Sequence, residues 1–403
     1  MKFKQFANPI LFLSDAPDQH TGLARIARDL ATLTATSHRF RVGYLGRGSI
    51  GDRRMPWTSY SYPADTGGWG EEYVANVWRN FSDGEDGIIF SNWDLSRLGW
   101  FLRPEHMRED IAAFLGPQRT FAKWIYTPVD SVGPNNTTLP VEMAHAAMGA
   151  DRLIVPSEWA AGVVGRHRPD VEWLPHGIFT DTFHPIPQAK QTLGIPASSI
   201  MIGCVMANQA RKDWPAAMEC AAALMQKYGS ERFGMWCHTD MELGGHSYWN
   251  LLALAADYGV GGCVKITTNL TDHQLALHYS ACDCTILPSA CEGFGYPIAE
   301  SMACGTAAVV TNYAAGQELV EEGCRVDPVA YRVDTQHNVK RAVLSGYGFA
   351  AKVEQQVELK KGDEEYRGEQ LVELVRHLDW RKLKHQWLRW LHQGLVGGGV
   401  TAA

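Results

Sequence analysis

The stretch that decides the fold is LPSACEGFGYPIAESMACGTAAVV, residues 287–310. It opens on the end of an apolar strand, which Pro288 breaks. A turn built on Gly293 and Gly295 follows, then a helix that ends at Gly305, and then an apolar run typical of the next strand. Strand, glycine turn, helix and strand in this order make half of a Rossmann-like unit, so the sequence predicts an α/β fold with parallel sheets.

This turn combines two kinds of ligand group. Gly293 and Gly295 carry no Cβ, so the backbone can approach a ligand closely, and the amides at the start of the following helix favour phosphate. Glu292 and Glu300 add carboxylates, which accept hydrogen bonds from hydroxyl groups. Amide donors for a diphosphate beside carboxylates for hydroxyls indicate a nucleotide-sugar site. The alternative is a helix that carries glutamates near its start for electrostatic reasons alone.

The same residues carry a family resemblance. EGFG at 292–295, with Glu300 eight positions after Glu292 and MACG at 302–305 behind it, resembles the E-x7-E signature of the retaining family 4 glycosyltransferases of the GT-B fold. The resemblance implies that Glu292 contacts hydroxyls of the donor sugar and that Glu300 holds the ribose hydroxyls. It also implies that four backbone amides lie along the diphosphate and sugar, those of Gly293, Phe294, Gly295 and Tyr296.

The composition bounds the class of protein. A chain of 403 residues suits two domains of about 180 to 200 residues each. A hydrophobic content of 45% and a charged content of 20% are ordinary for a globular protein. The formal net charge of −7 excludes a chain that is basic throughout and binds nucleic acid by charge alone, although a local basic surface stays open.

Cysteine usage and the N-terminal sequence indicate the compartment. Nine cysteines are scattered without a disulfide-like framework, so we expect reduced thiols and a cytoplasmic protein. The start, MKFKQFANPILFLSD, has a short apolar run that favours a first core strand over a signal peptide. Because no run reaches about 18 apolar residues, we expect no transmembrane segment.

The N-terminal half begins with a strand over residues 10–13 and a helix that opens at Gly22. Leu23, Ile26 and Leu30 recur at helical spacing. With one glycine, the loop between strand and helix is not a dinucleotide fingerprint. The family resemblance implies that Gly22 lets the backbone approach the donor phosphates from the N-terminal domain. The alternative is a glycine that only starts the helix.

Acidic residues follow two further strands of this half. Asp94 and Asp130 come after apolar runs, and the carboxyl ends of parallel strands face the ligand crevice, so they are its best acidic candidates. Many family members have a histidine at such strand ends, whereas TPVD at 127–130 resembles a variant, bacteriophage-type subgroup. We assign Asp130 to the catalytic set. His176 stands in a turn, where a structural hydrogen bond is favoured over a role as base.

The C-terminal half supplies the remaining donor contacts that the resemblance implies. A basic pair after its first strand grips the diphosphate, and Arg211 and Lys212 match it, with Arg211 replacing an arginine expected nearer the strand end. The loop at Asn269 and Leu270 receives the nucleobase through backbone contacts, and His238 lies at a neighbouring strand tip. Because backbone contacts do not depend on side-chain identity, the sequence hardly indicates which base is bound. We favour a UDP-sugar over a GDP-sugar.

Two stretches have competing interpretations. Residues 39–69 interleave basic and aromatic side chains: Arg39, Arg41, Arg47, Arg53, Arg54, Trp57, Tyr60, Tyr62 and Trp69. This pattern is typical of polyanion binding, but arginine stems packed on aromatic rings explain it too, and we favour packing. Residues 377–392 form a basic, aromatic, amphipathic helix. It is either the final helix that crosses back onto the N-terminal domain in GT-B folds, which we favour, or a peripheral contact with a membrane surface or nucleic acid.

The sequence thus predicts two Rossmann-like domains across a cleft: an acceptor-side domain at 1–185, a nucleotide-sugar-binding domain at 186–375, and a crossing helix with a tail at 376–403. The expected activity is retaining transfer of a sugar from a nucleotide-diphosphate donor to a hydroxyl of a glycan, lipid or small molecule, with no metal or other cofactor. Arg211 and Lys212 would stabilise charge on the departing diphosphate. The alternatives are transfer to a hydroxymethylated base in DNA and a non-catalytic nucleotide-sugar-binding subunit.

Overall fold

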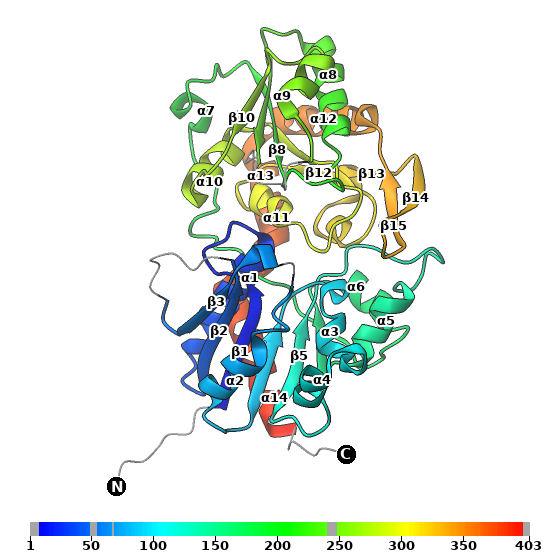
Figure 1. Cartoon of the computed structure of the whole chain (residues 1–403). Helices are drawn as coiled ribbons and strands as arrows, with labels where there is room; N and C mark the ends of the chain where they lie inside the picture. The colour runs from blue at the N-terminus through cyan, green and yellow to red at the C-terminus, as the bar shows by residue number, and fades with distance from the viewer. Residues whose placement is uncertain (1–7, 49–54, 67, 240–247, 398–403) are drawn as a thin grey trace. The chain divides into compact units, whose positions relative to one another are not determined.

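The computed structural model describes residues 8–48, 55–66, 68–239 and 248–397. Contacts between Cα atoms divide the chain into two compact units, Met1–His176 with Leu383–Ala403, and Gly177–Lys382. Each unit contains one parallel sheet with helices packed around it (Figure 1). The functional domain ranges 1–185, 186–375 and 376–403 stay a prediction.

The first unit has a seven-stranded parallel sheet of order β3-β2-β1-β4-β5-β6-β7. Its strands are β1 (Asn8–Asp15), β2 (Phe40–Arg47), β3 (Thr58–Tyr62), β4 (Gly87–Ser91), β5 (Phe121–Tyr126), β6 (Arg152–Val155) and β7 (Glu172–Trp173). Its helices are α1 (Gly22–Ala35), α2 (Val74–Ser82), α3 (Gly99–Leu102), α4 (Glu109–Leu115), α5 (Val141–Met148), α6 (Glu158–Val164) and most of α14 (Trp380–Gly397). The strand order reverses between β1 and β4, so the switch point of this sheet lies there.

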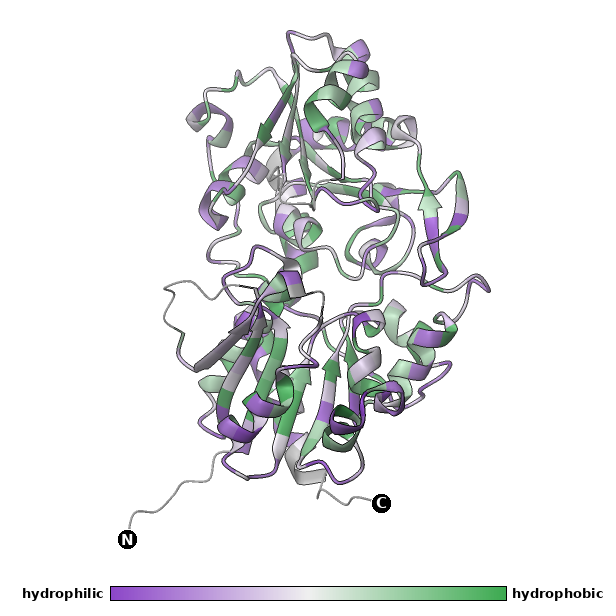
Figure 2. Ribbon diagram, viewed as in Figure 1, coloured by the Kyte–Doolittle hydropathy of each residue, from purple (hydrophilic) through white to green (hydrophobic). Residues whose placement is uncertain are grey.

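The central strands of this unit are buried on both faces, as expected of a parallel sheet covered by helices. The seven residues of β1 that follow its first position are all buried, and Figure 2 shows hydrophobic residues gathered along the strands of both sheets. Gly43 in β2 is required by packing, because a Cβ there would lie 2.7 Å from the ring of Phe81 in α2. The apolar runs of the sequence therefore become strands through burial against these helices.

The second unit has a six-stranded parallel sheet of order β10-β9-β8-β11-β12-β13 and an antiparallel hairpin. The sheet strands are β8 (Ile200–Val205), β9 (Phe233–His238), β10 (Val264–Thr267), β11 (Cys284–Leu287), β12 (Ala308–Thr311) and β13 (Arg325–Val326), and the hairpin strands are β14 (Ala330–Asp334) and β15 (Val339–Val343). Its helices are α7 (Ala189–Thr192), α8 (Trp214–Tyr228), α9 (Leu251–Asp257), α10 (Asp272–Ala281), α11 (Tyr296–Ala303), α12 (Gly346–Gly362) and α13 (Glu364–Val375). The order reverses between β8 and β11, which sets the switch point of this sheet.

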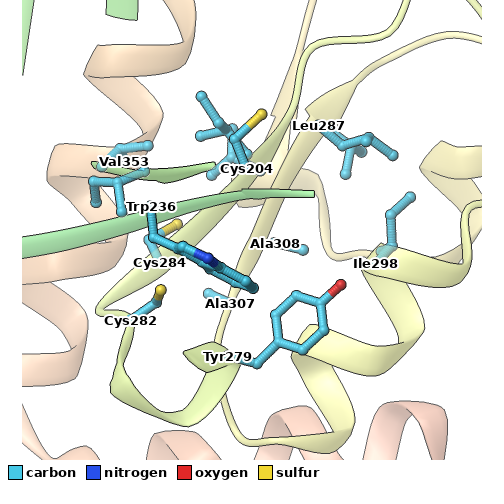
Figure 3. Packing of buried hydrophobic residues seen from close by; sticks show 14 of the residues in the cluster. Cys204, Trp236, Tyr279, Cys282, Cys284, Leu287, Ile298, Ala307, Ala308 and Val353 are labelled. Atoms are coloured by element: carbon cyan, nitrogen blue, oxygen red, sulfur yellow. The ribbon is translucent and has the colours of Figure 1, made fainter. Parts of the chain in front are cut away.

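The predicted strand, turn, helix and strand around residue 292 are confirmed as β11, α11 and β12. The core behind them packs Trp236 and Tyr279 edge to face, at 5.7 Å between ring centroids, near Leu287 and Ile298 (Figure 3). All nine cysteines are free, and eight of them are buried. None of the helices in the described residues combines the length and the apolarity that a membrane crossing requires.

The C-terminal helix α14 packs onto the first unit, as predicted. The indole Nε1 of Trp387 donates to the carbonyl of Pro175 at 2.9 Å, and that of Trp390 donates to a carboxylate oxygen of Glu172 at 2.8 Å. Both tryptophans are buried. The aromatic residues that suggested a membrane contact therefore belong to the core of this unit, which leaves basic side chains such as Arg389 exposed.

Of the described arginines between residues 39 and 69, Arg41 and Arg47 are held by contacts inside the first unit, whereas Arg39 is exposed. Arg41 donates to the carbonyls of Phe81 and Ser82 at 2.6 and 2.9 Å. Arg47 donates to the carbonyl of Ala64 at 2.6 Å, and its Cζ lies 4.4 Å from the centroid of Trp69. The predicted Arg53 and Arg54 lie outside the described residues. Arg41 and Arg47 therefore support packing on aromatic rings rather than a free basic surface.

The chain passes between the units through two segments that are tied together within the second unit. Ile178 and Asp379 form a parallel bridge, and the Ile178 amide donates to the carbonyl of Leu378 at 2.8 Å. The Asp379 carboxylate accepts hydrogen bonds from Thr180 and Arg381 at 2.5 Å each. Burial by itself raises the pKa of Asp379, but the hydrogen bonds from Arg381 and Thr180 outweigh it and lower the pKa to about 2.

We therefore expect an acid-dependent contribution of Asp379 to the stability of the second unit. Because the folded pKa lies below the unfolded value of about 4, the stabilisation is present above that value and is lost as the pH falls toward 2. Asp379→Asn should flatten the pH dependence of the urea midpoint between about pH 5 and pH 3. The control is Glu373→Gln, which removes an exposed carboxylate paired with Arg376. A wild-type slope in Asp379→Asn would contradict the assignment.

Candidate functional site

Two loops meet at the switch point of the second sheet. Lys212, after β8, forms an antiparallel bridge with Ser289, after β11. The Ala290 amide donates to the carbonyl of Arg211 at 2.8 Å, and the Asp213 amide donates to the carbonyl of Pro288 at the same distance. The two predicted site loops therefore run side by side at the carboxyl edge of the sheet, where ligands bind in open α/β sheets.

This pairing brings together one cation and one carboxylate of the predicted site. The Nζ of Lys212 forms an ion pair with Oε1 of Glu292, and the two side chains are only 7% and 12% exposed. Arg211 lies beside Lys212 on the same loop and is half-buried. Charges that are shielded from water interact more strongly than surface charges. A ligand that replaces Glu292 as the partner of Lys212, or Lys212 as the partner of Glu292, would therefore interact strongly with the residue that it pairs with.

The backbone around Glu292 is fixed from two sides. The Ala315 amide donates to the Glu292 carbonyl at 3.1 Å, and a Cβ on Gly316 would lie 3.2 Å from the Glu292 Cβ. On the other side Gly295 has φ 97°, a left-handed conformation that favours glycine, and it precedes the first residue of α11. The sequence EGFG therefore makes the close turn that the glycines predicted, with Gly293, Phe294 and Gly295 buried in it.

Glu300 lies inside α11 and is buried. Its Oε2 accepts a hydrogen bond from the hydroxyl of Tyr279 in α10 at 3.1 Å. A buried carboxylate needs such a donor, because an isolated buried charge is costly. Tyr296, the first residue of the helix, is half-buried. The structure thus puts both glutamates of the E-x7-E string on one turn and helix.

Three residues predicted to bind the nucleotide-sugar donor lie at the ends of the adjacent strands β9 and β10: His238, and Asn269 with Leu270, for which contact with the nucleobase was predicted. His238 ends β9, and its Nδ1 lies within hydrogen-bonding distance of Thr267 Oγ1, at 3.1 Å. The same hydroxyl accepts from Trp236 Nε1 at 2.8 Å. Asn269 follows β10 with φ 53° and is exposed, whereas Leu270 packs against the core. These contacts order the loop ends, and the base-binding role of these residues stays a prediction.

In the first unit, Gly22 begins α1 after β1, as predicted. A Cβ on Gly22 would meet no atom within 4 Å, so packing does not require the glycine and the backbone is open to approach. Thr21 caps the helix by accepting from the Ala24 amide at 3.1 Å, and its hydroxyl donates to Asp15 Oδ2 at 2.8 Å. Sequence reasoning missed this role of Asp15, although its place after a fully apolar strand was a usable signal.

The other polar residues of the first unit lie at neighbouring strand ends. Asp130 follows β5, is half-buried, and accepts from Ser131 Oγ at 3.0 Å. Asp94 follows β4 and lies 3.5 Å from Arg97. The catalytic role of Asp130 stays a prediction.

His176 has the structural role that was favoured for it. The ring is buried, and its Nδ1 lies 2.8 Å from the hydroxyl of Tyr126. Burial, and to a lesser degree the charge of Arg25, lower its pKa to about 3. His176 is therefore neutral at neutral pH.

The hairpin β14–β15 is a further element beside the site that the sequence analysis missed. The Ala342 amide donates to the carbonyl of Ala290 at 3.0 Å, and the guanidinium of Arg341 contacts Sγ of Cys291. Both partners belong to the loop that leads to Glu292. The alternation in AYRVD and VKRAV, separated by the polar TQHN, was the available signal.

Comparisons with known proteins identify similar sequences and similar folds. Residues 242–341 match the model of the family described as "Glycosyl transferases group 1". D-inositol 3-phosphate glycosyltransferase of Corynebacterium jeikeium is 28% identical over 144 residues, 34% of each chain, and that of Thermobispora bispora is 32% identical over 153 residues, 36% of each chain. The chain therefore spans about a third of the length of these relatives.

Solved structures cover nearly the whole chain. Sucrose-phosphate synthase from Thermosynechococcus elongatus has a TM-score of 0.74 at 16% identity, over 97% of this chain and 100% of its own. HepE of Anabaena, in complex with UDP-glucose, has a TM-score of 0.69 at 15% identity, over 96% and 99%. At these identities the likeness concerns the fold, and it confirms the predicted GT-B fold.

The fold is therefore of the GT-B class. Residues 242–341 are similar to the group 1 glycosyltransferases, and so are the aligned parts of the curated relatives, in agreement with the E-x7-E resemblance. Membership of a bacteriophage-type subgroup stays a prediction.

Proposed function

We propose that this chain is a retaining glycosyltransferase that moves a sugar from a nucleotide-diphosphate donor to a hydroxyl acceptor. The observation that carries the proposal is the buried pair of Lys212 and Glu292 at the switch point of the second sheet, with Glu300 eight positions further on in α11. A nucleotide sugar needs a cation that binds its phosphates and carboxylates that accept hydrogen bonds from its hydroxyl groups, and these residues supply both.

Each group has a role that follows from its chemistry. Arg211 and Lys212 stabilise the negative charge that develops on the departing diphosphate, as electrostatic catalysis requires. Glu292 accepts hydrogen bonds from the donor sugar, and Glu300 accepts them from the ribose. The leaving phosphate oxygen takes the proton of the acceptor hydroxyl, so the reaction demands no enzymic base. Arg211 and Lys212 supply the positive charge at the diphosphate, which is why the proposal includes no metal.

The donor is a UDP-sugar in this proposal. Support comes from a solved neighbour of the same fold, HepE of Anabaena, which was crystallised with UDP-glucose. The curated relatives are named for D-inositol 3-phosphate, so a phosphorylated polyol joins glycans, lipids and small molecules among the acceptors to be tested.

The test is transfer of label from UDP-glucose, UDP-N-acetylglucosamine and GDP-mannose onto a panel of acceptors, with the anomeric configuration read by NMR. The panel includes hydroxymethylcytosine-containing DNA with unmodified DNA as control. We expect transfer from a UDP-sugar to a small hydroxyl acceptor with retention. Label on the modified DNA alone would overturn the acceptor assignment, and the absence of both transfer and donor hydrolysis would leave a nucleotide-sugar-binding subunit.

Glu300→Gln should raise the KM for the donor about tenfold or more, because the amide replaces a charge-assisted acceptor of the ribose hydroxyls. The amide keeps the shape of the side chain and can still accept from Tyr279. Initial rates at varied donor concentration measure this KM. With a deoxyribose form of the donor, the KM values of wild type and variant should differ less, because the hydroxyl that Glu300 would bind is missing. An unchanged KM would remove Glu300 from the donor site.

A further inference from the structure

The hairpin β14–β15 borders the loop that carries Glu292. β15 contacts this loop through the Ala342 amide and through the side chain of Arg341, which reaches Cys291. The hydroxyl of Tyr313 donates to the carbonyl of Lys340 at 2.9 Å and ties the hairpin to the loop after β12. The hairpin is therefore anchored at the edge of the proposed donor site.

The register of this hairpin sets two arginines side by side. Arg332 in β14 lies directly opposite Arg341 in β15. Side chains at opposite positions of an antiparallel pair share one face, with Cβ atoms about 4.5 to 5.5 Å apart, and like charges placed so are destabilising. An anion bound between the two guanidinium groups would remove this repulsion.

The protein itself neutralises the arginine pair only weakly. Arg332 has a carboxylate partner, Asp334, at 3.3 Å, but the Arg332 side chain is 64% exposed and such surface pairs contribute little. Arg341 contacts a thiol, which is a weak acceptor, and within the described residues no carboxylate forms an ion pair with it. Asp213, which is half-buried, is close enough to interact electrostatically with Arg332, so the negative charge around the pair is concentrated on the Arg332 side and Arg341 has no ion pair of its own within the described residues.

We propose that Arg332 and Arg341 form an anion site that takes a phosphate monoester of the acceptor. The inference rests on the proposed function, since it adds the acceptor class to the same site. Guanidinium groups match phosphate oxygens in pairs, and a monoester carries about −1.5 to −2 charges, which two arginines balance. The two charges of a donor diphosphate already have partners in Arg211 and Lys212, so the hairpin pair is available to a second anion.

The first experiment measures binding of inorganic phosphate by calorimetry, with UDP present in excess to occupy the donor site. We expect Arg332→Ala/Arg341→Ala to weaken phosphate binding about tenfold or more. Arg332→Ala alone should weaken phosphate binding severalfold, and it replaces a side chain that is 64% exposed. Lys340→Ala is the matched control: it removes one positive charge from the same hairpin, where Lys340 lies over the Tyr331 ring at 3.8 Å. Equal phosphate affinity in wild type and the double variant would overturn the proposal.

The second experiment compares transfer from UDP-glucose to phosphorylated and unphosphorylated forms of one acceptor, glucose 6-phosphate with glucose and inositol 3-phosphate with inositol. We expect the wild type to prefer the phosphorylated form and the double variant to lose this preference with its donor KM unchanged. Transfer to modified DNA alone would overturn the monoester assignment.

The two proposals fail separately. Phosphate binding that depends on the arginine pair, without transfer or UDP binding, would sustain the anion site and sink the glycosyltransferase function. Sugar transfer together with a phosphate affinity that does not change when the two arginines are replaced would support the glycosyltransferase function and contradict the anion site.

Discussion

Glu292→Ala and Lys212→Ala should each lower the rate of sugar transfer by at least about 100-fold, the size of effect seen when one preorganised electrostatic group is removed from a site. In the structure the two side chains neutralise each other in a largely buried position. A diphosphate donor offers Lys212 a more highly charged partner, which frees Glu292 to accept from the sugar hydroxyls. Initial-rate assays with a UDP-sugar measure the losses.

UDP binding separates the two roles. UDP carries the diphosphate without the sugar, so Lys212→Ala should weaken UDP binding, whereas Glu292→Gln should bind UDP about as well as the wild type and still transfer slowly. Glu373→Ala, which removes an exposed carboxylate paired with Arg376, is the control for a general loss of charge. Rates near wild type for both Lys212→Ala and Glu292→Ala would remove the pair from the active site.

Folding must be checked in these variants, because removing one partner of a buried ion pair leaves an uncompensated charge and costs about 3 to 5 kcal/mol. The double variant Lys212→Met/Glu292→Gln carries neither charge and should be more stable than Lys212→Met alone. A stable double variant that is as inactive as the single variants would assign the lost activity to chemistry rather than to unfolding.

The turn at Glu292 and the helix α11 could be predicted because their signal is contiguous. The residues of the Glu292 turn and of α11 are neighbours in the chain, and their glycines and carboxylates each point to one chemistry. The ion pair between Lys212 and Glu292 could not be derived in the same way, since 80 residues separate the partners. Only the adjacency of β8 and β11 at the switch point brings their loops together.

The remaining elements depended on tertiary contacts that carry little local signal. The strands of the hairpin hold both apolar and charged residues, and its function-related pair, Arg332 and Arg341, is set by register. The arginines of residues 39–69 had a strong local pattern, yet Arg41 and Arg47 bond to backbone carbonyls inside the unit. The sequence shows which charged groups are present, but the groups that they contact depend on the tertiary structure.

The C-terminal helix gives a second large expected effect, in this case on the stability of the first unit. Trp387 is fully buried in the first unit, donates from Nε1 to the Pro175 carbonyl, and meets Tyr126 edge to face at 4.9 Å between ring centroids. Trp387→Ala should lower the free energy of unfolding of this unit by about 3 to 5 kcal/mol, because the cavity adds to the lost transfer energy. This is a large fraction of the 5 to 15 kcal/mol that typically stabilise a domain.

The chain has two units, so urea unfolding should be followed as two transitions rather than fitted as one. Excess UDP, which binds the second unit in the proposed function, should raise the midpoint of that unit and thereby assign the transitions. Trp387→Ala should then shift only the transition that UDP leaves unchanged. Trp387→Phe should lower the free energy of unfolding less than Trp387→Ala does, since it keeps an apolar ring and loses only the hydrogen bond. Arg389→Ala, on the exposed side of the same helix, should change this free energy little. If Trp387→Ala left the transition of the first unit in place, α14 would not be a structural part of the N-terminal fold, and its basic face would become available for a binding role.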